Sequence, residues 1–537
     1  MTLPRSFTRA AAAVTSIHAG LTADVLARHL QDVIVVLSTT VDEDDALAPA
    51  YLLATNLLAR LYPTLVLDAP TGLQQQASET AVRVNPRVAL AEPADDPSSC
   101  RIRLHVGRAD GRVPVHGGDV VTIDAAGWVA AVDMPAPEGL GPAAAPAALA
   151  GAAIGVGEVF RAVFARWLPN GGRGVPSPAL WDLVSGTCRA DEGDGESWTR
   201  SSETAPMLGA VHLAGAGAIG QAAALTWREA SATGELIVLD HDDVDVGNLQ
   251  RYVLADDADE GADKTEVIAR ALARCGLVVR PVRQRWGQGP ESAPGRAVVA
   301  VALDTADGRL SVAAGTHGRV YNAWTGPVDL GWSRHETFGG DEPCLACLYL
   351  PVGRRPSLHE QIGLALGQDP LRVRMYLPRG VVLSAPLAEV TPLPGQALPA
   401  EAPAWTASSL IDDLVTSGAI PAADRDAWAP RHVLDLWHEG VCGGSVLVRP
   451  GDKAEVPVPL AHQSALAGVM LATQVIVAAD PALRARRDRA GQGRLDLLGS
   501  LPQVIGRPRQ VTPGCLCRDD DYGRATRRTS QDPAGRD

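Results

Sequence analysis

Three glycines and a downstream carboxylate in the middle of the chain have the spacing of a nucleotide-binding turn. Gly215, Gly217 and Gly220 form the pattern GxGxxG, which permits a tight turn, a close approach of phosphate to the backbone and close packing of the next helix. Asp240 follows about 20 residues later, where a carboxylate can accept hydrogen bonds from a ribose. The spacing therefore predicts nucleotide binding.

Charged and amide residues after Asp240 favour a triphosphate over a dinucleotide. They are Asp242, Asn248, Arg251 and Lys264. A dehydrogenase needs an uncharged pocket for hydride transfer, whereas these groups can bind a triphosphate and stabilise charge that develops at its α-phosphorus. For the glycine motif alone, a nicotinamide-dependent oxidoreductase is the alternative.

Strands and a helix must position these residues. Apolar runs at 208–214 and 235–240 flank a small-residue helical pattern, so the sequence predicts a βαβ unit with the glycine turn at the helix N-terminus. A further apolar run at 297–303 leads into Asp304, and doubly wound sheets bind ligands at the carboxyl ends of their strands. An aspartate in this place can instead cap the next helix.

In their order, these residues resemble the nucleotide site of the ubiquitin-activating family, which includes the bacterial adenylyltransferases of sulfur-carrier proteins. That family reads D-x-D-x-V-x-x-S-N-L-x-R-Q and then a lysine. The matching residues here are Asp240, Asp242, Val244, Asn248, Leu249, Arg251 and Lys264. Gly247 replaces the usual serine, and Tyr252 replaces the usual glutamine.

The resemblance implies that a C-terminal carboxylate attacks the α-phosphorus of ATP to give an acyl-adenylate and pyrophosphate. Magnesium at Asp304, together with Lys264 and Arg251, would offset the developing charge. Arg309 lies where the family often has an arginine, and Arg5 or Arg9 could supply the arginine that often comes from the opposite half or protomer. The residues implied to bind ATP are Gly215, Gly217, Gly220, Asp240, Asp242, Asn248, Arg251 and Lys264.

Two close cysteine pairs, Cys344 with Cys347 and Cys515 with Cys517, could hold a metal. Four thiolates can surround zinc tetrahedrally at roughly 2.3 Å. Many members of the resembled family carry structural zinc on two CxxC pairs, so the resemblance implies zinc here, although the second pair is one residue shorter. Free buried cysteines and a redox CxxC are the alternatives.

Cys442 is followed by two glycines and is a candidate nucleophile. Glycine-flanked backbone is accessible and mobile, which attack on a bulky acyl-adenylate requires. Resembled enzymes that form thioesters carry a cysteine after the magnesium aspartate and before the C-terminal part of the adenylation domain, as Cys442 is placed. A buried, small apolar role is the alternative. His432 and His438 could lower the pKa of Cys442 or lie on a helix surface.

The first part of the chain repeats the strand, helix, strand order, at 33–38, 48–61 and 64–68. Its loop at 38–45 lacks glycine and ends in four consecutive acidic residues, which would repel a polyphosphate. We therefore predict an α/β fold with two Rossmann-like adenylation halves, the N-terminal one degenerate and the C-terminal one active, and an inserted catalytic-cysteine region. Alanine-rich helical patterns at 147–160 and 464–476 agree with such a duplication.

The predicted domains follow from this duplication. They are the inactive half at 1–184, a polar linker at 185–206, the active half at 207–349 and 456–517, the catalytic-cysteine region at 350–455, and a disordered tail at 518–537. The halves would act as a monomeric pseudo-dimer or within a homodimer.

Composition limits the partners. The 537 residues carry a net charge of −14 and no block of Lys and Arg, which argues against nucleic acid. No signal-peptide pattern and no uninterrupted apolar run of roughly 18 residues occurs, so we expect a cytoplasmic protein without a membrane partner.

The fused halves favour the thioester-forming branch of the resembled family. The implied function is activation of a ubiquitin-like protein, followed by a thioester on Cys442 and transfer to a conjugating enzyme, as in bacterial systems of antiviral (antiphage) defence. One alternative is an adenylyltransferase or sulfurtransferase for a sulfur-carrier protein in cofactor biosynthesis. Another is a scaffold that binds such a partner without catalysis.

Overall fold

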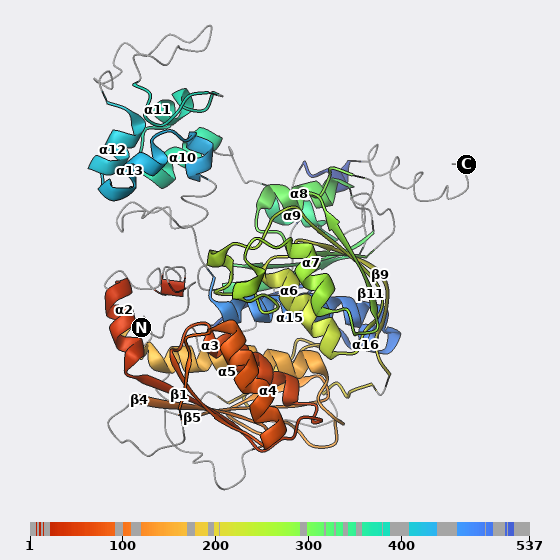
Figure 1. Cartoon of the computed structure of the whole chain (residues 1–537). Coiled ribbons are helices and arrows are strands. Elements are labelled where there is room, and N and C mark those ends of the chain that lie inside the picture. Colours follow the sequence, from red (N-terminus) through yellow and green to blue (C-terminus); the bar gives the residue numbers. More distant parts are fainter. Residues whose placement is uncertain are drawn as a thin grey trace. The chain divides into compact units, whose positions relative to one another are not determined.

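The computed structural model forms two compact units, residues 1–350 together with 459–537, and residues 351–458 (Figure 1). The structure describes residues 22–91, 100–108, 120–168, 178–191, 198–289, 298–350, 357–386, 408–437, 459–497 and 511–519, apart from 203, 316–317, 327–328, 337–341, 379, 489 and 513, together with the single positions 7, 10, 11 and 14. The larger unit contains two α/β halves, and the smaller unit is helical.

An eight-stranded sheet forms the first half, in the order β3-β2-β1-β4-β5-β6-β7-β8. Strands β1 to β5 are parallel, and β6 to β8 continue the sheet antiparallel. The strands are β1 Val33–Thr39, β2 Thr64–Asp68, β3 Ala89–Leu90, β4 Cys100–Val106, β5 Val120–Ala126, β6 Val129–Val132, β7 Ala179–Asp182 and β8 Cys188–Arg189. The helices are α2 Ala23–Gln31, α3 Ala48–Ala59, α4 Thr71–Val84 and α5 Ala145–Val163.

A seven-stranded sheet forms the second half, in the order β11-β10-β9-β12-β13-β14-β15. Its parallel part, β11 to β13, repeats the arrangement of β3 to β5, which is the Rossmann order. The strands are β9 Met207–Ala214, β10 Thr233–Asp240, β11 Leu277–Arg283, β12 Val298–Val301, β13 Arg319–Thr325, β14 Asp329–His335 and β15 Gln492–Asp496. The predicted α/β fold with two Rossmann-like halves is therefore confirmed.

The helices of the second half connect these strands and cover the sheet. They are α6 Ala218–Glu229, α7 Lys264–Ala271, α8 Ala306–Gly315, α9 Leu345–Tyr349, α15 Ala461–Ala479 and α16 Pro481–Arg486, with short 3-10 helices at η3 Val246–Asn248, η4 Asp257–Asp259 and η9 Leu516–Arg518. Helix α15 packs against α6 so closely that a Cβ on Gly468 would lie 2.4 Å from the carbonyl oxygen of Ile219. A glycine is needed there because no side chain fits.

Helices α5 and α15 pack against each other between the two halves (Figure 1). Their length and composition would allow either to cross a membrane, but 94% of each apolar window is buried inside the protein, as in the core helices of folded domains. The ring of His462 on α15 lies 5.7 Å from the ring of Phe160 on α5. The two alanine-rich patterns thus form the contact between the halves.

Part of the segment at 185–206, which we predict as a linker, is built into the first half. Cys188 and Arg189 form β8, which pairs with β7. Trp198 is buried in a cluster with Leu180 and Leu140, and the backbone N–H of Thr199 donates to Asp182 Oδ2 at 2.9 Å.

The smaller unit folds around its own apolar core. The helices are α10 Leu358–Leu366, α11 Pro370–Met375, α12 Leu410–Thr416, α13 Arg425–Trp428 and α14 Val433–Asp435, with a 3-10 turn at η7 Ala422–Asp424. The core residues include Ile362, Tyr376, Ile411 and Ile420. Arg372 is buried and donates to the backbone carbonyls of Ser408 and Ser409.

Candidate active site

The glycine turn connects β9 to α6. Gly215 has a φ of +102°, and a Cβ there would lie 2.7 Å from the carbonyl oxygen of Ala302. A Cβ on Gly220 would lie 2.1 Å from the carbonyl oxygen of Gly215, so only glycine fits at either position. Around Gly217, which caps α6 without a side-chain hydrogen bond, the nearest atom to an added Cβ is the Tyr252 hydroxyl at 3.5 Å. The first and third glycines thus build the turn, and the second leaves space where a phosphate can approach the helix N-terminus.

Asp240 ends β10 and joins the glycine turn to the next loop. Its Oδ2 accepts a hydrogen bond from the backbone N–H of Ala216 at 2.7 Å. Its Oδ1 accepts from the backbone N–H groups of His241 at 2.7 Å and Asp242 at 3.1 Å. The carboxylate that we expect to contact a ribose therefore also fixes the turn beside it.

Lys264 and Asp242 form an ion pair next to this carboxylate. The Nζ of Lys264 donates to Asp242 Oδ2 at 2.8 Å, and Lys264 is only 7% exposed. Burial acts to lower the pKa of Lys264, but Tyr252, Asp240 and Asp242 outweigh it and hold the pKa above its usual value. Burial acts to raise the pKa of Asp242, and Lys264 outweighs that effect, so the pKa is lowered. Both side chains are therefore charged at neutral pH.

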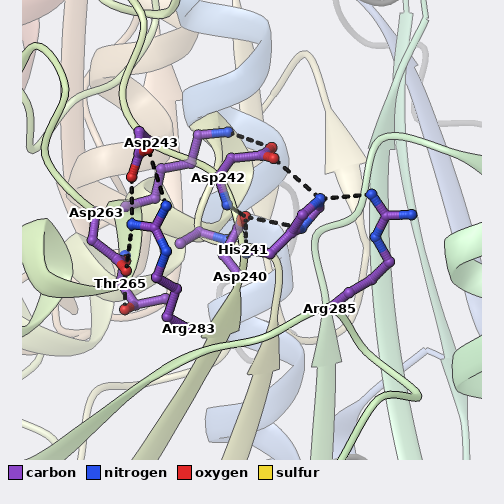
Figure 2. A network of polar contacts seen from close by, with 10 residues as sticks. Asp240, His241, Asp242, Asp243, Asp263, Thr265, Arg283 and Arg285 are labelled. Carbon is purple, nitrogen blue, oxygen red and sulfur yellow. Dashed lines mark hydrogen bonds and ion pairs between the residues drawn. The ribbon is translucent and has the colours of Figure 1, made fainter.

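A polar network extends from this pair along the ends of β10 and β11 (Figure 2). His241 Nε2 lies 3.2 Å from Asp242 Oδ1 and 2.8 Å from a guanidinium nitrogen of Arg285. Arg283 reaches Asp243 Oδ2 at 3.0 Å and Asp263 Oδ2 at 3.2 Å. This network fixes both sides of the loop that carries Asp242.

Asp263 also starts the helix that begins with Lys264. Its Oδ1 accepts from the backbone N–H of Thr265 at 2.8 Å and from the Thr265 hydroxyl at 2.7 Å. Our sequence analysis missed Asp263, although an aspartate just before a helical pattern is an N-cap signal. It also missed Arg283, whose pairing with Asp243 spans too much sequence for a local pattern.

Asn248 and Arg251 lie in and just after the 3-10 turn η3. Asn248 Oδ1 accepts from the backbone N–H of Asp245 at 3.1 Å, while Asp245 Oδ1 accepts from Gly247 at 2.7 Å. Arg251 Nη1 is buried and has no hydrogen-bond partner among the described residues. Burial lowers the pKa of Arg251, and the Asp304 carboxylate opposes this effect. A guanidinium with a buried donor that has no partner among the described residues matches the acceptor-rich oxygens of a polyphosphate.

Asp304 follows β12 and is exposed, near enough to Arg251 to influence its charge. The hydroxyl of Thr305, rather than the Asp304 carboxylate, accepts the first-turn hydrogen bond from Gly308 at 3.1 Å. Asp304 is thus available to a cation such as magnesium. Arg309 instead donates to Asn322 Oδ1 and to the carbonyl oxygen of Ala323, both at 3.1 Å, and so holds α8 to β13.

The two cysteine pairs come together at the edge of the second half, and all four residues are at most 9% exposed. The sulfur of Cys344 lies 4.0 Å from that of Cys347 and 3.6 Å from that of Cys515, and the sulfur of Cys347 lies 3.6 Å from that of Cys517. Tetrahedral zinc with roughly 2.3 Å bonds spaces its sulfurs by roughly 3.8 Å. Burial raises the pKa of Cys515 to about 11, and a bound metal ion would favour its thiolate form. The four sulfurs therefore fit zinc.

Other residues of interest lie outside the described part of the chain. These are Cys442, His438, Arg5 and Arg9. His432, which is described, caps α14 by accepting from the backbone N–H of Leu434 at 3.2 Å. The nucleophile prediction for Cys442 therefore stays a prediction.

The fold and the site define a class of protein. A glycine turn on a Rossmann-like sheet, an enclosed lysine and an arginine whose Nη1 has no partner among the described residues suit a nucleotide with several phosphates. The chain belongs to the ThiF family, whose model matches residues 209–480, about half of the chain. This family is part of the adenylyltransferase superfamily of the ubiquitin-activating enzymes, so the resemblance found in the sequence is confirmed.

Individual relatives are similar over different lengths. A protein of Sinorhizobium fredii (strain NBRC 101917 / NGR234), named "Uncharacterized protein y4jF", is 29% identical over 502 residues, which are 89% of this chain and 87% of that protein. The crystal structure of E. coli MccB with MccA-N7isoASN is 14% identical, covers 58% of this chain and 67% of that chain, and has a TM-score of 0.34. The crystal structure of E. coli MccB with ATP is also 14% identical, covers 57% and 65%, and has a TM-score of 0.32.

Proposed function

We propose that this protein uses ATP to adenylate the C-terminal carboxylate of a ubiquitin-like protein. The observation that carries the proposal is the Arg251 side chain near the glycine turn, whose buried Nη1 has no partner among the described residues. A buried cationic donor without a partner is costly, and phosphate oxygens would satisfy it. Membership of the ThiF family supports the same reaction class.

In the proposed reaction, a carboxylate oxygen of the partner attacks the α-phosphorus of ATP. The bond between the α-phosphorus and the bridging oxygen breaks, and pyrophosphate leaves with the electron pair. The N-terminus of α6 at Gly217 would receive phosphate oxygens, and Arg251 would donate to them. Lys264, held by Asp242, would supply a second positive charge. Magnesium, when bound, would offset phosphate charge, with Asp304 as its ligand.

A second step would transfer the acyl group to Cys442. The thiol sulfur would attack the acyl carbonyl, AMP would leave, and the thiol proton would pass to solvent. The thioester would then pass to a conjugating enzyme, in a cytoplasmic pathway of the kind used in bacterial antiviral defence. Zinc on Cys344, Cys347, Cys515 and Cys517 would be structural, since four thiolates leave no open position.

The test incubates the purified protein with magnesium-ATP and a candidate ubiquitin-like protein. Pyrophosphate exchange reports adenylation, and intact mass with a non-reducing gel reports the thioester. We expect exchange and a reductant-sensitive adduct that is absent in Cys442→Ala and retained in the control Cys275→Ala.

Other outcomes would redirect the proposal. Exchange without an adduct in the wild-type protein would contradict the thioester step and favour a sulfur-carrier adenylyltransferase. ATP binding without pyrophosphate exchange, with every candidate ubiquitin-like protein tested, would favour a scaffold that binds such a partner without catalysis. Failure to bind ATP would overturn the proposal as a whole.

A further inference from the structure

The loop that carries Arg251 is completed by residues of the other half. Its own half satisfies several backbone donors, because Arg251 N donates to Asn248 O at 3.1 Å and Leu254 N donates to Gln221 Oε1 at 3.1 Å. Three backbone carbonyls of the loop, on either side of Arg251, instead accept hydrogen bonds from the first half. They belong to Leu249, Val253 and Ala255.

The donors come from α3 and the residue that follows it. Arg60, which is 2% exposed, donates through Nη1 to Leu249 O and through Nη2 to Ala255 O at 3.3 Å. Its Nε donates to Asn56 Oδ1 at 2.9 Å, and Asn56 Nδ2 donates to Val253 O at 3.0 Å. One guanidinium and one amide thus form a connected clamp on the loop.

The clamp is charged under working conditions. Burial lowers the pKa of Arg60 to about 9, and the Asp256 carboxylate opposes the effect. The side chain is therefore protonated at neutral pH. Carbonyl oxygens compensate a buried guanidinium, and the rigid planar fork of arginine holds its donors in fixed directions, whereas the ammonium of lysine is a compact charge on a flexible stem.

We infer that Arg60 and Asn56, in the half that lacks a phosphate turn, are positioning residues for the nucleotide site of the other half. They hold the backbone on both sides of Arg251, so that its guanidinium faces the phosphates. This inference rests on the proposed ATP site and adds a role for the first half in nucleotide binding.

The experiment is a double-mutant cycle on ATP affinity. Equilibrium dialysis against labelled ATP, up to millimolar concentrations, is applied to the full-length wild type, Arg60→Ala, Arg251→Ala and the double variant. If Arg60 acts through Arg251, Arg60→Ala weakens binding about tenfold in the wild-type background and by less than twofold when Arg251 is already alanine.

Further variants separate positioning from general stability. Asn56→Ala should weaken ATP binding a few-fold. The control Asn85→Ala removes a buried amide of the same half, which donates to Ala59 O at 3.2 Å and contacts no residue of the loop through its described hydrogen bonds. Asn85→Ala should lower the melting temperature and leave ATP affinity unchanged. Arg60→Lys should restore part of the affinity, and it replaces Arg60→Ala in the cycle if the alanine variant does not fold.

The outcomes distinguish the positioning role of Arg60 and Asn56 from the proposed ATP site. If the losses of ATP affinity in Arg60→Ala and Arg251→Ala multiply in the double variant, the two residues act independently. That result would overturn the inference, while the ATP site would stand. Equal effects of Asn56→Ala and Asn85→Ala on ATP affinity would overturn it as well. A wild-type protein that binds no ATP would overturn the proposed function and this inference with it.

Discussion

The two halves share one strand order and differ where β1 and β9 end. In the second half, β9 passes into a glycine turn, where a Cβ on Gly217 would meet the Tyr252 hydroxyl at 3.5 Å. In the first half, Tyr51 of α3 is fully buried and donates from its hydroxyl to Leu37 O of β1 at 3.1 Å. The fourth residue of the helix is thus a large aromatic in one half and Gln221 in the other. The same strand order thus carries a glycine turn at the end of β9 and a buried tyrosine beside the end of β1.

The difference also shows what the first half has kept. It supplies α5 to the contact with α15, and it supplies Asn56 and Arg60 to the loop around Arg251. The side chains of its acidic loop at 38–45 make local contacts. Glu43 Oε2 accepts a hydrogen bond from Gln76 at 3.2 Å, and Asp45 Oδ1 accepts one from the backbone N–H of Leu47 at 2.8 Å. The first half thus packs against the second and donates hydrogen bonds to its loop.

The largest expected effect concerns the cysteine cluster, which no described part of the first half reproduces. Cys344→Ser should remove one equivalent of zinc and destabilise the second half by several kcal/mol, because metal binding contributes directly to folding. Elemental analysis and thermal unfolding would measure both. Cys188→Ser, in the first half, is the control and should keep the zinc. Equal zinc contents in the two variants would contradict a zinc site at Cys344.

The glycine turn gives the next largest effect. Gly220→Ala would place a Cβ 2.1 Å from Gly215 O, so the turn must shift, and ATP binding should fall about a hundredfold or more. Gly151→Ala in α5 is the matched control, because its added Cβ would meet nothing closer than 3.7 Å. That variant should be stabilised by roughly 0.5–1 kcal/mol, since glycine is unfavourable within helices. Retained ATP binding in Gly220→Ala would contradict a nucleotide site at the glycine turn of the second half.

Lys264 is a further difference between the halves, because residues 1–206 contain no lysine. Lys264→Met should weaken ATP binding about thirtyfold, roughly 2 kcal/mol, through loss of a charge close to the phosphates. Asp242→Asn breaks the same 2.8 Å ion pair but keeps the ammonium group. It should weaken ATP binding less than Lys264→Met does, because the positive charge stays close to the phosphates. If both variants lost affinity equally, the pair would be structural and Lys264 would not contact phosphate.

The contact between the halves predicts a pH effect. Burial lowers the pKa of His462 to about 3, so the folded protein keeps this ring neutral while the unfolded chain protonates below about 6.5. Stability from this residue is full above pH 6.5 and falls by up to ~1.4 kcal/mol per pH unit toward pH 3. His462→Gln should flatten the decline in melting temperature between pH 7 and pH 4.5. His29→Gln, at a less buried ring, should flatten the decline less. A larger effect of His29→Gln than of His462→Gln would contradict the assignment of this pH effect to His462.

The sequence alone was sufficient for the features that are local or periodic. Apolar, β-branched runs such as Val33–Thr39 marked strands, and the glycine spacing marked the turn, because each depends on neighbouring residues. The cysteine pairs were found because their spacing is local, and their proximity followed from the resemblance. The Arg60 clamp and the Arg283 network could not be found, since they join side chains separated by long stretches whose approach only the folded sheets determine.

The smallest expected effect concerns Tyr51, which packs beside the end of β1 in the first half. Tyr51→Phe removes the hydrogen bond to Leu37 O and should cost about 1 kcal/mol of stability without changing ATP affinity. Tyr62→Phe is its control, because the Tyr62 hydroxyl is buried without a hydrogen-bond partner among the described residues. Removal of that hydroxyl should be neutral or stabilising, since it relieves an unsatisfied polar group. Thermal unfolding and ATP dialysis on both variants provide the measurement. A loss of ATP affinity in Tyr51→Phe would mean that the end of β1 still takes part in nucleotide binding.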